Sequence, residues 1–266
     1  MVRQCTSARI VICGSDTRGD GDKQGTYDPR IRTIALIDHT REYPPAPGVL
    51  DAIAEALTIQ VQRDLAPTWG VTEARFKVGG RGDKIHFFDS ADEATDCGWH
   101  IVDDDGDPYS HVFAAASTTH GSDWVKGSDP ISVTASHEAL EMFTDPRANE
   151  FCFDGDQHLW AREVCDPVQS GSYKILAGGM RVPVSNFVLP AYFNPWAPGP
   201  YDHLGVLKKP FSLDKGGYAV LERATKDQER YGRRFGVTFD DAMPEWQRSD
   251  KLQGWGRTYW RLALTV

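Results

Sequence analysis

The sequence predicts an α+β protein built on a mixed sheet, and three observations support this class. Short β-type runs rich in Val, Ile and Phe recur through the first half of the chain. A long amphipathic stretch follows the second of these runs. A second helical stretch, about 130–143, follows the last of them and carries the dipeptide His137-Glu138. Strands mixed with a few helices in this order are typical of a helix-covered sheet.

Each β-type run is bounded by Gly, Asp, Pro or Ser, the residues that favour turns. The predicted strands of the first half are ARIVIC (8–13), RTIALID (32–38), ARFKVG (74–79), KIHFFD (84–89), WHIVDD (99–104) and SHVFAAAS (110–117). Between the second and third of these, residues 48–67 have apolar side chains at helical spacing, and Pro67 is expected to end that helix.

The second helix has a clear predicted start. Asp129 is a good N-cap residue, Pro130 suits the first helical turn, and the Asp145-Pro146 pair should stop the helix. Residues four apart lie above one another on a helix. His137 and Glu141 are therefore expected to point together toward the face on which the helix packs.

The composition excludes several classes of function. Asp and Glu number 38 against 29 Lys and Arg, for a formal charge of −9, which argues against nucleic acid or an anionic membrane as the main partner. No apolar stretch approaches 18 residues, and the N-terminus lacks the pattern of a signal peptide. Five cysteines without a C-x-x-C pair fit reduced thiols and a cytoplasmic location, although Cys152 and Cys165 are spaced to bridge a short loop.

The spacing His137, Glu138, Glu141 resembles the zinc-binding signature H-E-x-x-H with a glutamate in the second ligand position. One helical turn brings the side chains at i and i+4 to a single ion, and the intervening Glu138 stands beside the bound water as general base. A carboxylate ligand partly neutralises the cation. This admits manganese or calcium as alternatives to zinc.

A third ligand is expected from the acidic segment after the helix. Glu163 lies 22 residues beyond Glu141 and is our first choice, while Asp166 is a candidate fourth ligand or a partner that orients His137. Tyr173, Tyr201 and His203 are candidate donors to a developing oxyanion. His100, His111 and His120 are candidates for lining a substrate cleft, although a structural role is the simpler interpretation of each.

The motifs SHEALEMFTDP, WAREVCD and SNFVLPAYF resemble those of a largely uncharacterised family of bacterial and phage-associated proteins with the pattern S-H-E-x-x-E-x-x-x-D-P, distantly similar to plant EXORDIUM-like proteins. The resemblance covers roughly residues 50–195. It implies a zincin-like fold, a metal site at His137, Glu141, Glu163 and Asp166 with Glu138 as catalytic residue, and a zinc-dependent peptidase activity on a peptide or protein substrate.

Two domain segments and two classes of function are expected. Residues 1–195 are predicted to form the metal-binding domain and 196–266 a loop-rich, β-containing extension, which is either separate or part of the same domain. The first functional hypothesis is a metal-dependent peptidase or amide hydrolase. The alternative is a non-catalytic structural protein of a phage or other particle, with a structural or vestigial metal site, in an assembly or homo-oligomer.

Overall fold

The structure is a computed structural model that describes residues 10–12, 32–91, 97–103, 106–223 and 237–240. The strands are β1 (Ile10–Ile12), β2 (Arg32–Asp38), β3 (Ala74–Val78), β4 (Asp83–Phe88), β5 (Gly98–Val102), β6 (Pro108–Phe113), β7 (Glu150–Phe153), β8 (His158–Ala161), β9 (Ser172–Ala177), β10 (Met180–Ser185), β11 (Leu221–Arg223) and β12 (Val237–Asp240). The α-helices are α1 (Val49–Gln60), α2 (Ala66–Trp69), α3 (Ala114–Thr118) and α4 (Ile131–Thr144). The α+β class is confirmed.

The main sheet has the strand order β3-β2-β4-β6-β5. Its first four strands are parallel, and β5 runs antiparallel along one edge beside β6. Alternation along each strand sends one set of side chains, including Ile34, Ile85 and Phe87, into the core. The predicted strand 110–117 ends at Phe113, because Ala114–Thr118 turns into α3.

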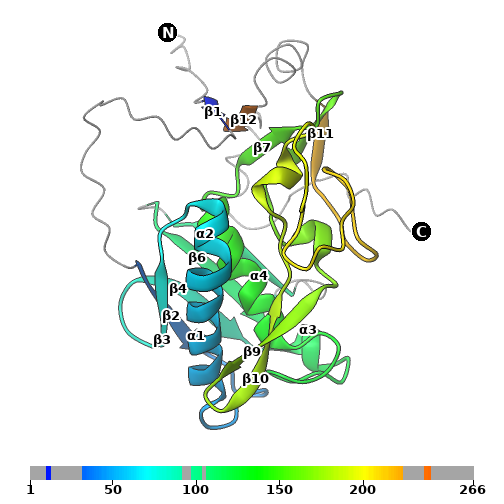
Figure 1. Cartoon of the computed structure of the whole chain (residues 1–266). Helices are drawn as coiled ribbons and strands as arrows, with labels where there is room; N and C mark the ends of the chain where they lie inside the picture. Colours follow the sequence, from blue (N-terminus) through cyan, green and yellow to red (C-terminus); the bar gives the residue numbers. More distant parts are fainter. Residues whose placement is uncertain (1–9, 13–31, 92–96, 104–105, 224–236, 241–266) are drawn as a thin grey trace.

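Helices α1 and α4 cover the same face of this sheet (Figure 1). Ile53 and Leu57 of α1 are fully buried, and each contributes about 2 kcal/mol through loss of contact with water. The expectation that Pro67 ends this helix was wrong. A π-helical turn (Val61–Leu65) follows α1, and Pro67 then occupies the first turn of α2, where a missing N–H group is tolerated.

Helix α4 matches the predicted second helix closely, but its start differs from the prediction. Pro130 holds the N-cap position, and no side chain caps the helix, so the assignment of Asp129 as N-cap was wrong. The free N–H groups of Ile131 and Ser132 donate instead to the carbonyl groups of Asp123 and Trp124. The loop before the helix therefore replaces a capping side chain.

The Pro- and aromatic-rich stretch 180–205 is predicted from the sequence to be extended, ordered loop, and the structure differs at its start, where 180–185 is strand β10. Residues 172–185 form the β9-β10 hairpin, which packs on both α1 and α4. Pro183 is tolerated within β10 because this sheet has only two strands, which leaves one edge of each without a neighbouring strand. Ser132 in α4 donates a hydrogen bond to the carbonyl of Pro183, which fixes the hairpin on the helix.

A second five-stranded sheet has the order β1-β12-β7-β8-β11 and lies at the other end of the molecule (Figure 1). Its strands come from three parts of the chain: β1 is the first described segment, β7 and β8 follow α4, and β11 and β12 are the last described strands. The stretch TYWRLAL (258–264), which is predicted from its aromatic and aliphatic residues to be a strand of the C-terminal extension, lies outside the described residues. Among the residues that the structure describes, no helix is long and apolar enough to cross a membrane.

Candidate metal centre

Helix α4 presents its acidic residues to the interior and not to solvent. Glu138 is 5% and Glu141 is 3% exposed, and the side chain of His137 is 14% exposed. Helical periodicity places His137 and Glu141 one turn apart, and their contact distance, 3.2 Å from Nε2 to Oε2, confirms that they face each other. Ionised carboxylates are rarely buried unless a cation or several hydrogen bonds compensate them.

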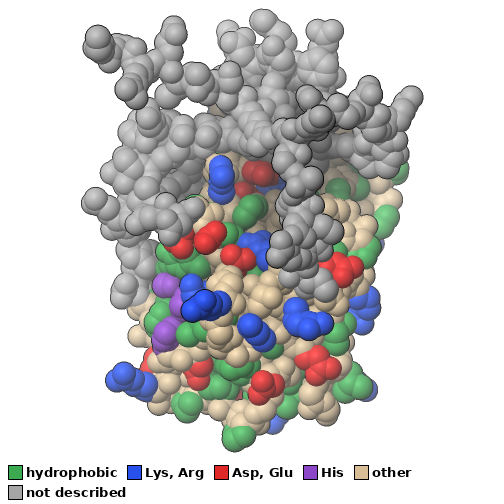
Figure 2. Space-filling view, turned by 90° about the vertical axis from the view of Figure 1, so that its left-hand side faces the viewer, with side chains coloured by type: hydrophobic (Ala, Val, Ile, Leu, Met, Phe, Trp, Pro, Cys, Tyr) green, Lys and Arg blue, Asp and Glu red, His purple; other side chains and the backbone are tan. Residues whose placement is uncertain are grey.

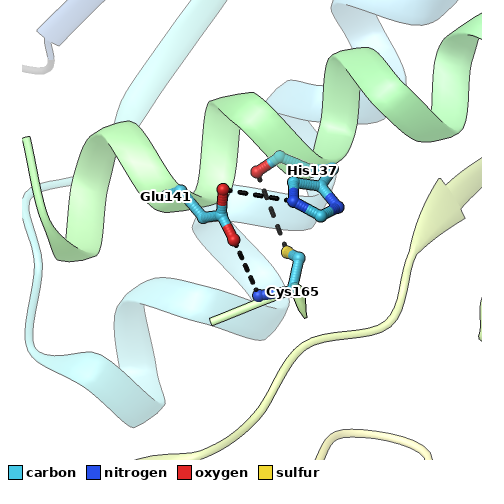
Figure 3. Close-up of side chains that lie close together, drawn as sticks. All are labelled: His137, Glu141 and Cys165. Carbon is cyan, nitrogen blue, oxygen red and sulfur yellow. Dashed lines mark hydrogen bonds and ion pairs between the residues drawn. The ribbon is translucent and has the colours of Figure 1, made fainter. Parts of the chain in front are cut away.

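The first group of potential ligands surrounds Nε2 of His137. This nitrogen lies 3.2 Å from Glu141 Oε2 and 3.1 Å from Asp166 Oδ1. Cys165 completes the group, because its backbone N–H donates to Glu141 Oε1 (3.1 Å) and its thiol lies 3.7 Å from the carbonyl of His137 (Figure 3). Both acids face the same ring nitrogen. That arrangement suits shared ligands of one ion better than a partner that orients the ring from its other nitrogen.

The segment that carries Asp166 is fixed by backbone hydrogen bonds from distant parts of the chain. Val188 N–H donates to the carbonyl of Val164, and Tyr218 N–H donates to the carbonyl of Asp166. A 3-10 turn at Asp166–Val168 then directs the Asp166 carboxylate toward α4. The position of this acid is therefore set by long-range pairing.

A second group of potential ligands lies on the β5 side of α4. His100 comes from β5, and its Nδ1 lies 3.6 Å from Glu138 Oε2 and 3.8 Å from Glu141 Oε2. The other ring nitrogen, Nε2, lies 3.0 Å from the carbonyl oxygen of Asp145. Glu141 thus belongs to both groups, and the two imidazoles lie near the same oxygen of its carboxylate, Oε2.

Glu163 lies with the second group and not with the first. Its Oε2 is 3.8 Å from His100 Nε2, whereas the acid in contact with His137 is Asp166. The predicted residues Glu138, Glu141, Glu163 and Asp166 are all brought together and are all at least 95% buried. The two candidates for the third ligand therefore lie next to different histidines: Asp166 contacts His137, and Glu163 lies beside His100.

Burial in this cluster favours the neutral form of its acids. It raises the pKa of Glu141 to about 8, with repulsion from Asp166 and Glu163 adding to the effect and His137 opposing it. It also raises the pKa of Asp145 to about 7, although Asp145 accepts two backbone hydrogen bonds beyond the end of α4.

The pKa values of the two imidazoles in the cluster are also raised, but here the charges of the acids are the cause and burial opposes them. Burial disfavours the charged form of His100, but the negative charges of Glu163, Glu138 and Glu141 outweigh it and raise the pKa of His100 to about 10. The pKa of His137 is likewise raised well above its ordinary value, against the effect of burial, by Glu141 and Asp166. In the metal-free protein, protons therefore balance the buried carboxylates, and a bound cation would displace them.

Tyr218 is a site residue that the sequence did not indicate. Its phenol hydrogen-bonds to Asp166 and lies close enough to Glu141 and Glu138 that burial and their charges raise its pKa well above the ordinary value. The two phenols predicted as oxyanion donors are engaged elsewhere: Tyr173 donates to Asp64, and Tyr201 donates to the carbonyl of Ala197. The third predicted donor, His203, stacks on Phe187.

Three other histidines form a contrasting group on the opposite face of the main sheet. His39 lies 2.9 Å from His86, and His86 contacts the ring of His111. Burial and the neighbouring imidazoles lower the pKa of His86 and lower that of His111 to about 4. Figure 2 shows histidine side chains gathered at the surface. His120, the remaining cleft candidate, is exposed and contacts the carbonyl of Ala116.

Among the described residues, neither the cysteines nor the surface hollow forms a second candidate functional site away from α4. Of the described cysteines, Cys97, Cys152 and Cys165 are not disulfide-bonded, so the bridge considered between Cys152 and Cys165 does not form. A shallow hollow of about 410 Å³ between α1 and β3 is lined by residues such as Asp51 and Phe76 and includes none of the predicted site residues. The chemistry is therefore concentrated around α4.

Comparisons of the chain with family models, with curated proteins and with solved structures find no match. The family resemblance described above remains a prediction. The function is consequently argued from the buried cluster itself.

Proposed function

We propose that this protein is a metal-dependent hydrolase that acts on a peptide or a related amide. The observation that carries the proposal is the burial, on one helix face, of a His-Glu pair at i and i+4 beside a third acid. His137, Glu141 and Asp166 supply one imidazole and two carboxylates, a donor set that suits zinc or manganese. Cys165 adds a softer donor at the same position, which favours zinc.

A divalent cation at this position would polarise the substrate carbonyl and lower the pKa of water. Glu138 would accept the proton of the attacking water on its carboxylate and pass it to the leaving amine. His100 lies against Glu138 Oε2 and limits the positions that this carboxylate can take. The phenol of Tyr218 hydrogen-bonds to Asp166 and would hold that carboxylate in position as a ligand.

A structural ion is the second candidate function, and the depth of the site favours it. The four acidic site residues are at least 95% buried, and a structural metal site is closed by protein ligands. The same residues would then join α4 to the segment 162–168 without any turnover. An enzyme differs in leaving one coordination position open to water and substrate.

Metal removal separates these two functions. The purified full chain is expected to contain at least one equivalent of zinc or manganese by elemental analysis, and to hydrolyse members of a peptide and amide substrate library. A chelator should abolish hydrolysis, and returning the metal should restore it. A chain that binds no metal, even after loading with zinc and with manganese, would contradict both functions. Metal-dependent thermal stability without hydrolysis would support the structural ion.

Gly98→Ala tests the position assigned to Glu138. A Cβ atom at residue 98 would lie 2.8 Å from Glu138 Oε1 and 3.0 Å from the carbonyl oxygen of His111, so the carboxylate must move. We expect kcat to fall on the order of ten-fold or more while one equivalent of metal stays bound, because displacement of a catalytic group by a fraction of an ångström is costly. Unchanged kcat would show that the carboxylate position next to β5 is not used in catalysis.

A further inference from the structure

The cluster around α4 contains a second group of donor atoms that the proposed reaction does not use for metal. One donor atom each from His100, Glu138 and Glu141 lies within 4.8 Å of the others. All three residues are at least 95% buried. Glu141 is shared with the group around His137, so two positions for cations stand side by side.

The orientation of His100 is the independent observation that indicates a ligand. A carbonyl oxygen only accepts hydrogen bonds, so Nε2 carries the hydrogen that it donates to Asp145. Nδ1 then faces the carboxylates, 3.6 Å from Glu138 Oε2 and 3.8 Å from Glu141 Oε2. Atoms that bind one ion at about 2.1 Å are roughly 3.4–3.6 Å apart. An imidazole whose other nitrogen donates to a backbone carbonyl is the usual form of a metal-ligating histidine.

The charge of the cluster points the same way. Glu138, Glu141, Glu163 and Asp166 are buried carboxylates, in addition to Asp145, which accepts two backbone N–H groups. Once metal has displaced the protons of the cluster, one divalent cation would neutralise only half of these four carboxylates. A second cation would bring the group to neutrality, which favours its uptake into a region of low dielectric.

We propose that His100, Glu138 and Glu141 form a second, weaker cation site, and that an ion bound there withdraws Glu138 from water activation. Excess divalent metal would then inhibit the enzyme. The inhibition rests on the proposed hydrolase function, whereas the binding of a second ion does not. The second site is weaker because its ion shares Glu141 and is repelled by the first ion.

Metal titration of the full chain tests the binding. The metal-stripped protein is titrated with zinc, and separately with manganese, by calorimetry with elemental analysis after dialysis. Wild type is expected to take up two equivalents. His100→Gln should weaken the second binding step by about a hundred-fold or more and leave the first equivalent bound. His111→Gln is the matched control, because His111 lies in the neighbouring strand β6 on the opposite face of the sheet, and it should still bind two.

Hydrolysis measured across the same titration tests the inhibition. Activity should rise to a maximum near one equivalent of metal and fall as the second ion binds. In His100→Gln, activity scaled to the maximum of that variant should not fall, whatever the size of that maximum. Binding of two ions without any hydrolysis would sustain the second site and refute the proposed function. Activity that stays at its maximum while two ions are bound would refute the inhibition.

Wild type itself provides a measurement that no folding defect can affect. Two manganese ions that share Glu141 would lie about 4 Å apart, and their electron spin resonance spectrum should change from that of an isolated ion to that of a coupled pair between one and two equivalents. The proposal is overturned if wild type holds one ion in a large excess of metal. It is also overturned if His111→Gln, and not His100→Gln, loses the second ion.

Discussion

Glu138→Gln is expected to lower kcat by about 10²–10⁴-fold, the usual contribution of a general base, while the first equivalent of metal stays bound. Glutamine has nearly the shape of glutamate and keeps the contact with β5, but its amide does not accept the proton of water. The donor atoms of His137, Glu141 and Asp166 are untouched by the change. Because the substitution also removes a ligand of the proposed second site, kcat is measured at one equivalent of metal.

Glu42→Gln is the matched control for this experiment. Glu42 lies on an exposed loop, so the same change of charge should leave both kcat and metal content unaltered. Loss of the first metal ion from Glu138→Gln would show that Glu138 is a ligand of that ion. A variant that keeps more than about a tenth of wild-type kcat would remove Glu138 from the role of base.

The metal-free protein is expected to lose thermal stability as the pH rises from about 5 to about 9, by several degrees in Tm. The pKa of Glu141 is raised from 4.5 to about 8, and that of Asp145 from 3.8 to about 7. Over these ranges the folded state holds protons that the unfolded state has released, so stability falls as the pH rises. His100, with its pKa raised from 6.5 to about 10, adds stability that is complete below pH 6.5 and is lost toward pH 10.

Bound metal should reverse this trend, because a cation replaces the protons and binds better as they leave. Differential scanning calorimetry of stripped and metal-loaded protein across this pH range provides the measurement. Glu141→Gln should flatten the slope of the stripped protein, since one of the groups with a raised pKa is gone. A Tm of the stripped protein that stays constant or rises over this range would contradict the arrangement of buried charge described above.

The sequence predicted the parts of the site that depend on one helix. His137 and Glu141 meet because helical geometry alone places residues i and i+4 together, and the range of α4 was visible in its periodicity and in Pro130. Most strands of the main sheet were predicted for the same local reason. The prediction that the helix ends at Pro67 failed because a π-helical turn, which has no simple sequence pattern, connects α1 to α2 and leaves Pro67 in the first turn of α2.

The remaining site residues depend on contacts between distant segments. Whether Glu163 or Asp166 reaches His137 is decided by the 3-10 turn at Asp166 and by its hydrogen bond from Tyr218, some 50 residues away. The alternation along β5 places His100 on the inner face, but only the register of β5 against β6 sets it opposite Glu138. No sequence pattern indicated that Tyr218 belongs to the site, because it lies in the segment 196–266, which was predicted to be a loop-rich extension after the metal-binding domain.

The hydrogen bonds from Asp214 and Tyr218 to Pro167 and Asp166 have a consequence for how the protein is made. Synthesis proceeds from the N-terminus, so α4 leaves the ribosome long before the residues that hold Asp166 in place. A nascent chain that has not reached residue 218 has the two proposed ligands of the helix but lacks the hydrogen bond that supports the segment of the third, Asp166. At the proposed metal site, firm capture of an ion is therefore expected only after residue 218 has been made, when its backbone N–H can donate to the Asp166 carbonyl.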